Sequence, residues 1–538
     1  MPPILHARRW VAALALLAAA PSAAAQPDDR SRLPSLTPAV FESRGTVSVA
    51  LPAVERQPLS GFGPPPRTFV VPADRQPTSR PFDPDLDALP ALVLAPPPEP
   101  ASDTRDLRRV RAEAGGGAHA SRYGRLDLSG ASASGEFFVD ADYDGVSGSD
   151  ERVRFDRVDL RAGGRSFAPG RLRIEGHALL DGYDTPATNA TARRRRRALG
   201  AEVGLEGLGA IRYALAVGFE QSQLARTDGS EPETNEGRLD AEGRLAFLQN
   251  RVRLDAAAGT AGDGGFGSDV TYGAAGLSVA FGDPERARLV VGARALAFDG
   301  SATAGGGDGQ ALGAVLDVQV PLGTGRAFLT NDPHLGVRSL SDLTETNPYV
   351  RPDPIVFPDL VPVDARLGIE LRPGAARVRA YGLVMHAPTY LVFERLGGEF
   401  GEAYVQATAA GLGGDVTVAA PSGLSASAGL EVRAGRVEGG DEIPFYAPLV
   451  GRAGFQVPFL QGRGRVGLSA LAESTRPETR AGTTSAPAWG LLALDARYDI
   501  AGPFSAIARG ERLVGTAERW PGSPEPPFTV MLGLRFAR

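Results

Sequence analysis

Short segments of alternating apolar and polar residues run from about residue 107 to the C-terminus, separated by turn-forming residues. In the last segment, Phe528–Arg538, apolar side chains fall at every second position, and Arg535 lies among the small or polar residues between them. Successive side chains of a strand point to opposite faces, so each segment predicts a strand with one apolar and one polar face. The repetition predicts an all-β chain.

The clearest predicted hairpin spans residues 363–386, with Pro373-Gly374 as its turn. Gly supplies the positive φ that a type II turn needs after Pro. The polar faces of both strands carry charges of both signs, which suit a water-filled lumen and would be costly against lipid. The candidate lumen charges are Asp364, Arg366, Glu370, Arg372, Arg377 and Arg379.

Short and long connections alternate along the chain, as they do in outer-membrane barrels with tight turns at one end and long loops at the other. Counting strands by this alternation gives about 22 between residues 107 and 537. No internal apolar run reaches the ~20 residues of a membrane helix, so a spanning structure must be a closed barrel. The predicted fold is a large antiparallel transmembrane β-barrel over residues 107–538.

The first 106 residues differ from the rest. Residues 1–25 combine a basic start, an apolar stretch and Ala23-Ala24-Ala25, which together predict a secretory signal peptide. Residues 26–106 contain Pro64-Pro65-Pro66 and Pro96-Pro97-Pro98, and they predict an extended segment, because proline interrupts regular structure. With the barrel in the outer membrane of a Gram-negative-type cell, this segment is expected in the periplasm.

Composition narrows the possible chemistry. The chain has 538 residues, 68 glycines, no cysteine and a net charge of −6, which does not favour a nucleic-acid partner. The five histidines show no metal-ligand spacing, and no nucleophile motif or phosphate-binding loop is present. We therefore predict no enzyme activity, no cofactor and no metal site.

Two segments stand out beyond the strand pattern. The basic run Arg193, Arg194, Arg195, Arg196 and Arg197 predicts a loop patch at the barrel mouth. It could bind anionic lipopolysaccharide or an acidic solute, or it could be a solvated loop end. Residues 331–362 form the longest predicted connection, and loops of this length are often lids. We hypothesise that this loop folds over or into the lumen and gates it.

The stretch Ala517–Phe536 (AERWPGSPEPPFTVMLGLRF) resembles the end of the barrel of TonB-dependent outer-membrane receptors. The resemblance implies solute uptake or binding, with outer-membrane lipid around the barrel and TonB as a possible energy-coupling partner. A globular plug is not recognisable in residues 26–106. Strand parity places the last strand's end at the periplasmic side, where the barrel assembly machinery would read a terminal signal, for which the candidates are Phe528, Val530, Leu532, Leu534 and Phe536.

Two alternatives to a receptor-like barrel remain open. The first is a passive porin-type channel. The second is a secreted or cell-surface structural β-protein with a dry core, which would have to bury many charged side chains at several kcal/mol each.

Overall fold

A computed structural model describes most of the chain beyond residue 106. The described residues are 107–132, 134–147, 154–167, 170–186, 191–209, 211–226, 233–263, 269–283, 287–300, 307–351, 356–396, 399–420, 422–515, 518–520, 523–524 and 528–537. The predicted signal peptide and proline-rich segment lie outside them and remain predictions.

Twenty-two antiparallel strands form one closed barrel, as predicted. The first half consists of β1 (Leu107–Gly117), β2 (Arg122–Ala131), β3 (Gly135–Ser147), β4 (Arg154–Ser166), β5 (Arg171–Pro186), β6 (Thr191–Leu208), β7 (Arg212–Arg226), β8 (Thr234–Phe247), β9 (Val252–Asp263), β10 (Val270–Asp283) and β11 (Ala287–Gly300). The second half consists of β12 (Asp308–Leu322), β13 (Gly325–Asn331), β16 (Val363–Leu371), β17 (Ala376–Leu396), β18 (Glu399–Ala419), β19 (Ser425–Val437), β20 (Leu449–Phe459), β21 (Gly464–Glu473), β24 (Trp489–Ala501), β25 (Phe504–Val514) and β28 (Phe528–Ala537).

Short elements lie in the connections. They are η1 (Ala118–Ala120), β14 (His334–Gly336), α4 (Leu340–Thr346), β15 (Asp359–Val361), η3 (Leu460–Gly462), β22 (Arg476–Pro477), β23 (Ser485–Ala486), β26 (Glu518–Trp520) and β27 (Ser523–Pro524). Among the described residues, no helix is long and apolar enough to cross a membrane.

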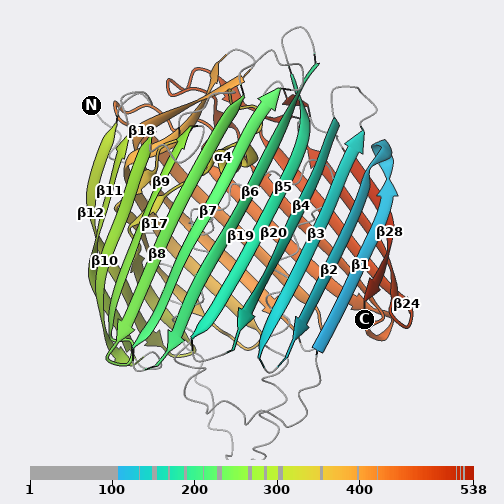
Figure 1. Cartoon of the computed structure of the whole chain (residues 1–538), viewed down its shortest axis with the longest axis horizontal. Coiled ribbons are helices and arrows are strands. Elements are labelled where there is room, and N and C mark those ends of the chain that lie inside the picture. Colours follow the sequence, from blue (N-terminus) through green and yellow to red (C-terminus); the bar gives the residue numbers. More distant parts are fainter. Residues whose placement is uncertain are drawn as a thin grey trace, which may run out of the picture. The chain divides into compact units, whose positions relative to one another are not determined.

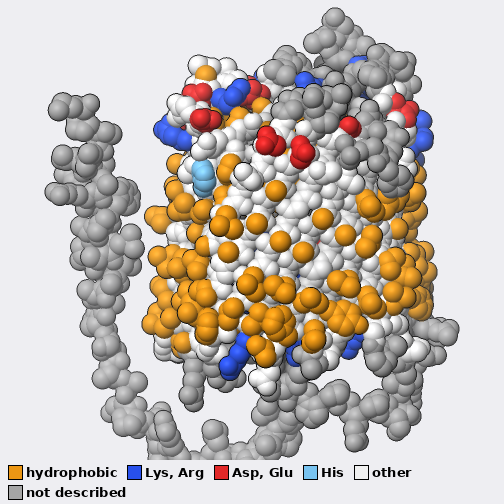
Figure 2. All heavy atoms as spheres, turned by 60° about the vertical axis from the view of Figure 1, so that its left-hand side comes forward, with side chains coloured by type: hydrophobic (Ala, Val, Ile, Leu, Met, Phe, Trp, Pro, Cys, Tyr) orange, Lys and Arg blue, Asp and Glu red, His pale blue; other side chains and the backbone are white. Residues whose placement is uncertain are grey.

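The predicted alternation is visible in how the strands expose their side chains. On β28, Phe528 and Leu532 are 47% and 65% exposed, whereas Met531 between them is 1% exposed. Exposed apolar side chains of this kind recur around the barrel and form the belt in Figure 2. An apolar belt outside a wall whose inner face is polar is the arrangement of a barrel in lipid.

The two ends of the barrel differ. At one end, the short-turn end, two to five residues join successive strands, as at 323–324 and 420–424. The first barrel strand begins and the last one ends there (Figure 1). The opposite end, the long-loop end, carries the longest connections, including 332–362 and 474–488.

One connection at the long-loop end is largely a strand extension. β17 and β18 have 21 residues each, pair with each other as far as Leu396 and Glu399, and form a projecting hairpin. The reason is apolar packing, because Leu391, Val392 and Phe393 are all less than 9% exposed. These side chains pack against other connections at the long-loop end, so the hairpin shares its core with them.

The barrel closes where β1 pairs with β28. Glu113 of β1 is buried there and lies 2.9 Å from Arg509 of β25 and 3.6 Å from Arg535 of β28. The strands approach closely beneath the Tyr123 ring, since a Cβ added at Gly533 would lie 2.2 Å from the Tyr123 hydroxyl. A buried ion cluster and a glycine contact therefore hold the closing seam.

Candidate functional site: a loop inside the barrel

Residues 332–362, which we call the lumen loop, turn inward from the long-loop end between β13 and β16. Its β14 pairs with β15, and β15 pairs in turn with the β17 extension, where Leu360 lies opposite Thr389. Side chains at lumen-facing positions of β4, β6, β8 and β11 hold its first part. The sequence hypothesis that this segment folds over or into the lumen therefore agrees with its position.

The middle of the lumen loop is the short helix α4, and local sequence explains where it begins. The Ser339 side chain accepts a hydrogen bond from the Asp342 backbone N–H (3.1 Å), and the Asp342 carboxylate accepts one from the Ser339 N–H (2.9 Å). This reciprocal capping box satisfies two of the donors that every helix start leaves unpaired. The helix was not predicted from the sequence, although Ser339 and Asp342 have the spacing of a capping box.

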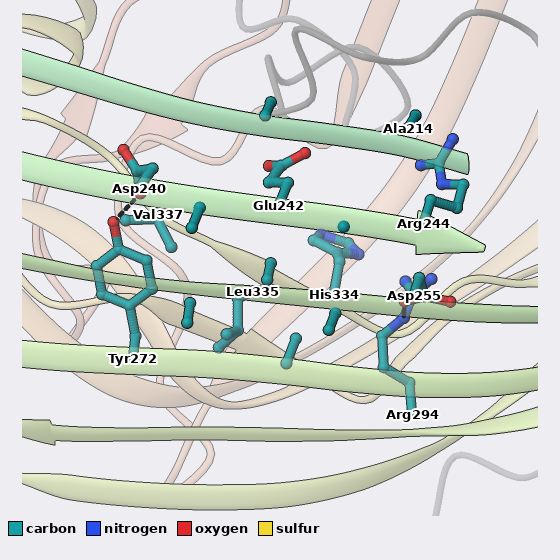
Figure 3. A pocket seen from close by; sticks show the side chains of 17 residues that line it. Ala214, Asp240, Glu242, Arg244, Asp255, Tyr272, Arg294, His334, Leu335 and Val337 are labelled. Carbon is teal, nitrogen blue, oxygen red and sulfur yellow. Dashed lines mark hydrogen bonds and ion pairs between the residues drawn. The ribbon is translucent and has the colours of Figure 1, made fainter. Parts of the chain in front are cut away.

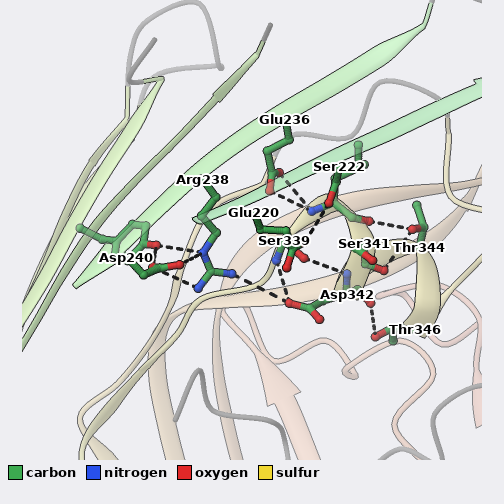
Figure 4. A network of polar contacts seen from close by, with 12 residues as sticks. Glu220, Ser222, Glu236, Arg238, Asp240, Ser339, Ser341, Asp342, Thr344 and Thr346 are labelled. Atoms are coloured by element: carbon green, nitrogen blue, oxygen red, sulfur yellow. Dashed lines mark hydrogen bonds and ion pairs between the residues drawn. The ribbon is translucent and has the colours of Figure 1, made fainter. Parts of the chain in front are cut away.

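The barrel wall provides a further partner for the start of α4 (Figure 4). Glu236 of β8 accepts the Leu340 backbone N–H with both carboxylate oxygens at 3.1 Å. Arg238, two residues along the same strand face, lies 2.6 Å from Asp240 and 4.0 Å from Asp342. One face of β8 therefore binds both a backbone group and a side chain of the lumen loop.

Arginines of β6 and β4 hold the rest of α4. Arg196 donates to the Ser341 carbonyl (3.0 Å) and the Thr344 hydroxyl (3.3 Å), and it also pairs with Asp181 at 2.7 Å. Arg157 pairs with Glu345 at 3.0 Å. Although burial raises the pKa of Glu345, the charges of Arg157 and Arg196 outweigh it and hold that pKa below its ordinary value.

The second half of the lumen loop is held by the projecting β17–β18 hairpin. The buried Asp359 carboxylate lies 2.7 Å from Arg338 and accepts the Leu391 backbone N–H of β17 at 2.6 Å. The Phe357 N–H donates to the Tyr404 hydroxyl of β18 at 2.8 Å. The loop is therefore bonded both to the barrel wall and to the projecting β17–β18 hairpin.

An apolar cluster connects the lumen loop to the connections around the long-loop end. Leu343, Tyr349 and Val350 of the loop pack with Phe400, and the same cluster contains Leu391, Phe393, Phe445, Ala486 and Trp520 from other connections. Leu343, Val350 and Phe400 are each 0% exposed. These connections form one packed layer with the lumen loop and cover this part of the barrel mouth.

A pocket lies between the first part of the lumen loop and the wall formed by β7–β11 (Figure 3). The loop contributes His334, Leu335 and Val337, and the wall contributes charged side chains of both signs. Arg294 is already paired with Asp255 at 2.9 Å and with Asp332 at 2.9 Å. Within the described ranges, no group of three or more His, Cys, Asp or Glu side chains could hold a metal ion.

The basic run lies elsewhere than predicted. Arg193–Arg197 belong to β6 and are not in a loop. Arg194 and Arg196 are 1% and 2% exposed and bind the lumen loop, Arg194 through the Val350 carbonyl. Arg195 and Arg197 are exposed on the opposite face. The prediction of one loop patch was wrong, because strand alternation divides the run between the lumen and the outer surface.

The six candidate lumen charges occupy the face opposite the exposed Leu367 and Ile369, mostly near the short-turn end. Glu370 contacts three arginines, Arg326 (3.2 Å), Arg372 (2.7 Å) and Arg377 (2.9 Å). Arg379 pairs with Asp415 at 2.8 Å, and both Arg366 and Arg379 lie over the Tyr381 ring. The Asp364 backbone N–H donates a hydrogen bond to the Asn331 side-chain oxygen, next to the start of the lumen loop. What these charges do remains a prediction.

The candidate assembly residues on β28 lie at alternating positions that share one face of the strand. Phe528, Val530, Leu532 and Leu534 are between 47% and 65% exposed on the lipid-facing side. Phe536 is half-buried and packs edge-on against Phe504, with ring centroids 5.5 Å apart. That the barrel assembly machinery recognises these residues remains a prediction.

Sequence reasoning missed the wall residues that bind the lumen loop, chiefly Arg157, Glu236 and Arg238. Each sits in an ordinary alternating strand, and nothing local distinguishes it from other lumen charges. Their partners are a hundred or more residues away, as with Glu236 and Leu340, so only the folded barrel brings them together.

Comparisons with known proteins support the fold. The chain matches the copper transporter OprC (12% identity, TM-score 0.59, 81% of this chain and 80% of that one). It also matches the FrpB iron transporter from Neisseria meningitidis, F3-3 variant (10%, 0.60, 81% and 82%), and BauA, the ferric preacinetobactin receptor from Acinetobacter baumannii (12%, 0.58, 81% and 80%). No family model and no curated protein matches the chain. The predicted resemblance to TonB-dependent receptor barrels is confirmed at the level of the fold.

Proposed function

We propose that this protein is an outer-membrane barrel that takes up or binds a solute and whose long-loop end is closed at rest by the lumen loop. The observation that supports this most directly is the bonding of the loop both to the wall, through Glu236 and Arg196, and to the projecting β17–β18 hairpin, through Tyr404 and the Leu391 N–H. In this proposal, a solute that passes through the lumen displaces part of this network.

The solved barrels that match the chain support the transport class, since those proteins are described as transporters or receptors for copper, iron and ferric preacinetobactin. We infer that this protein resembles them in having uptake as its function and catalysing no reaction. We further propose that the long-loop end faces outward and that the N-terminal segment lies in the periplasm, where a TonB-type partner could act on it.

The passive porin alternative differs in one measurable respect. A porin holds an open aqueous channel, whereas a barrel closed by bonded segments conducts only after those segments move. Permeability of the unmodified chain therefore separates the two functions.

Liposome swelling tests the proposal with the full chain. The key variant replaces residues 334–360 by a short Gly-Ser linker, which the geometry permits because the Asp332 N–H already lies 3.3 Å from the Asp364 carbonyl. We expect slow swelling for the wild type and at least tenfold faster swelling for the variant. A wild type as permeable as an open porin, or a variant as slow as the wild type, would contradict closure by the loop.

A point substitution provides a milder version of the same test. Arg196→Gln removes the charge that binds Ser341, Thr344 and Asp181, so we expect intermediate swelling. Arg436→Gln is the matched control, because Arg436 lies at the same end of the barrel on an outward-facing position of β19. Heat-modifiable gel mobility checks that all variants are folded.

A further inference from the structure

The outward face of β6 changes character along its length. Towards the short-turn end it exposes Leu199, Val203 and Leu205, which are 59%, 49% and 37% exposed. The next outward positions towards the long-loop end are Arg197 and Arg195, both exposed. The boundary between apolar and cationic side chains therefore falls within one strand, between residues 199 and 197.

Neighbouring strands continue this boundary. Leu180 of β5 is the direct partner of Arg197 and is 50% exposed. Higher on the same face, the Arg193 side chain crosses over Gly182 and pairs with Asp156 of β4 at 2.7 Å. Arg122 of β2 reaches the same carboxylate at 4.0 Å with 62% of its side chain exposed. Positive charge thus extends from β2 to β6 just beyond the apolar belt.

Two of these arginines differ from the others in their bonding. Arg193 and Arg122 share Asp156, whereas Arg195 and Arg197 have no hydrogen-bond or ion-pair partner among the residues that the structure describes. Guanidinium groups bind phosphate through two parallel N–H donors and keep their charge at every relevant pH. Adjacent outward positions on a strand lie about 7 Å apart, close enough for both to contact one phosphorylated head group.

We propose that Arg195 and Arg197, with Arg193 and Arg122 beside them, bind the phosphate groups of a phosphorylated lipid in the leaflet at the long-loop end. Its acyl chains would lie against Leu180, Leu199 and Val203. A free phosphate ion would gain nothing from the apolar side chains beside the arginines. A soluble acidic solute would not reach a lipid-facing surface. The proposal rests on the proposed membrane location but not on the lumen loop being a gate.

Native mass spectrometry of the purified full chain in detergent tests the site, with bisphosphorylated lipid A as the probe. We expect the wild type to retain the lipid, Arg195→Gln and Arg197→Gln each to weaken retention about fivefold, and the double variant to weaken it roughly twentyfold. Arg436→Gln, an outward-facing arginine at the same end, should retain the lipid as the wild type does.

Two further measurements identify the source of the binding energy. Dephosphorylated lipid A should bind the wild type at least tenfold more weakly, and millimolar inorganic phosphate should compete poorly. Equal retention by wild type and double variant, or equal binding of the dephosphorylated lipid, would overturn the proposal, and efficient competition by free phosphate would show an ion site instead. Liposome swelling is measured on the double variant as well, so that a failure of lipid binding can be told apart from a failure of the transport function.

Discussion

Adjacent arginines of β6 have opposite environments, and this contrast explains much of the molecule. Arg196 is 2% exposed and binds α4, whereas Arg197 is exposed beside Leu180. The difference comes from strand alternation alone, since consecutive side chains point to opposite faces. A run of identical residues therefore contributes side chains to two different surfaces. The effect of substituting one arginine does not predict the effect of substituting the next.

Glu345 provides a residue-scale prediction about pH. Its pKa is lowered because Arg157 and Arg196 favour the carboxylate despite burial. A carboxyl whose pKa is lower in the docked loop stabilises docking above its ordinary pKa, near 4.5, and this contribution is lost as pH falls through the lowered value. We expect Glu345→Gln to raise swelling at pH 7 by a few-fold.

Acidic pH provides a control for the Glu345→Gln substitution. At a pH below the lowered pKa, Glu345 is protonated in the wild type as well, so wild type and Glu345→Gln should swell at the same rate. A difference that persists unchanged at acidic pH would show that the glutamine acts through shape and not through charge.

At the scale of elements, the β1–β28 seam decides whether the barrel stays closed. Glu113 is the only partner that Arg535 has among the ion pairs of the described residues, and it also binds Arg509 and Arg111. Removing one member of a buried ion cluster leaves uncompensated charge, which typically costs 3–5 kcal/mol. A weakened seam exposes two strand edges, which closure otherwise removes.

We therefore expect Glu113→Gln to lower the free energy of unfolding by about 3 kcal/mol, measured by denaturant titration in detergent. Glu136→Gln is a matched control on β3, because its side chain is 46% exposed and its partner Arg165 lies 3.8 Å away. An exposed pair of this kind contributes about 1 kcal/mol or less. Equal stability of the two variants would argue against the seam cluster.

At the scale of the whole molecule, the chain must enter the membrane before any of these contacts exist. Phe536 is half-buried against Phe504 at the short-turn end, so its truncation removes little packing from the finished barrel. Arg535 lies in the seam and affects stability after closure. We predict that Phe536→Ala impairs insertion more than Arg535→Ala does.

Quantifying each variant in isolated outer membranes, together with its heat-modifiable fraction, checks this prediction. Phe536→Ala should reach a severalfold lower membrane level, whereas Arg535→Ala should insert but lose its folded mobility at a lower temperature. Equal membrane levels would indicate that the terminal aromatic has no special role in assembly.

The barrel itself could be predicted from the sequence because its signal is local. Period-two alternation in segments such as 363–371 and 528–537 reports which face meets lipid, whatever the rest of the chain does. The alternation of short and long connections then gave the even strand number and the common end of β1 and β28. The same logic failed for Arg193–Arg197, because all five positions are arginine, so the sequence shows no alternation there even though the strand continues.

Only the tertiary structure decided what the lumen loop contacts. Leu340 and Glu236 are 104 residues apart, and their contact depends on the barrel's circumference, on the inward turn after β13 and on the register of β8. None of these is encoded near either residue. The sequence alone determined a lipid-facing surface and a charged interior, since both follow from neighbours along one strand. The docking of the lumen loop depends on partners far away in the sequence, which alternation along a strand cannot specify.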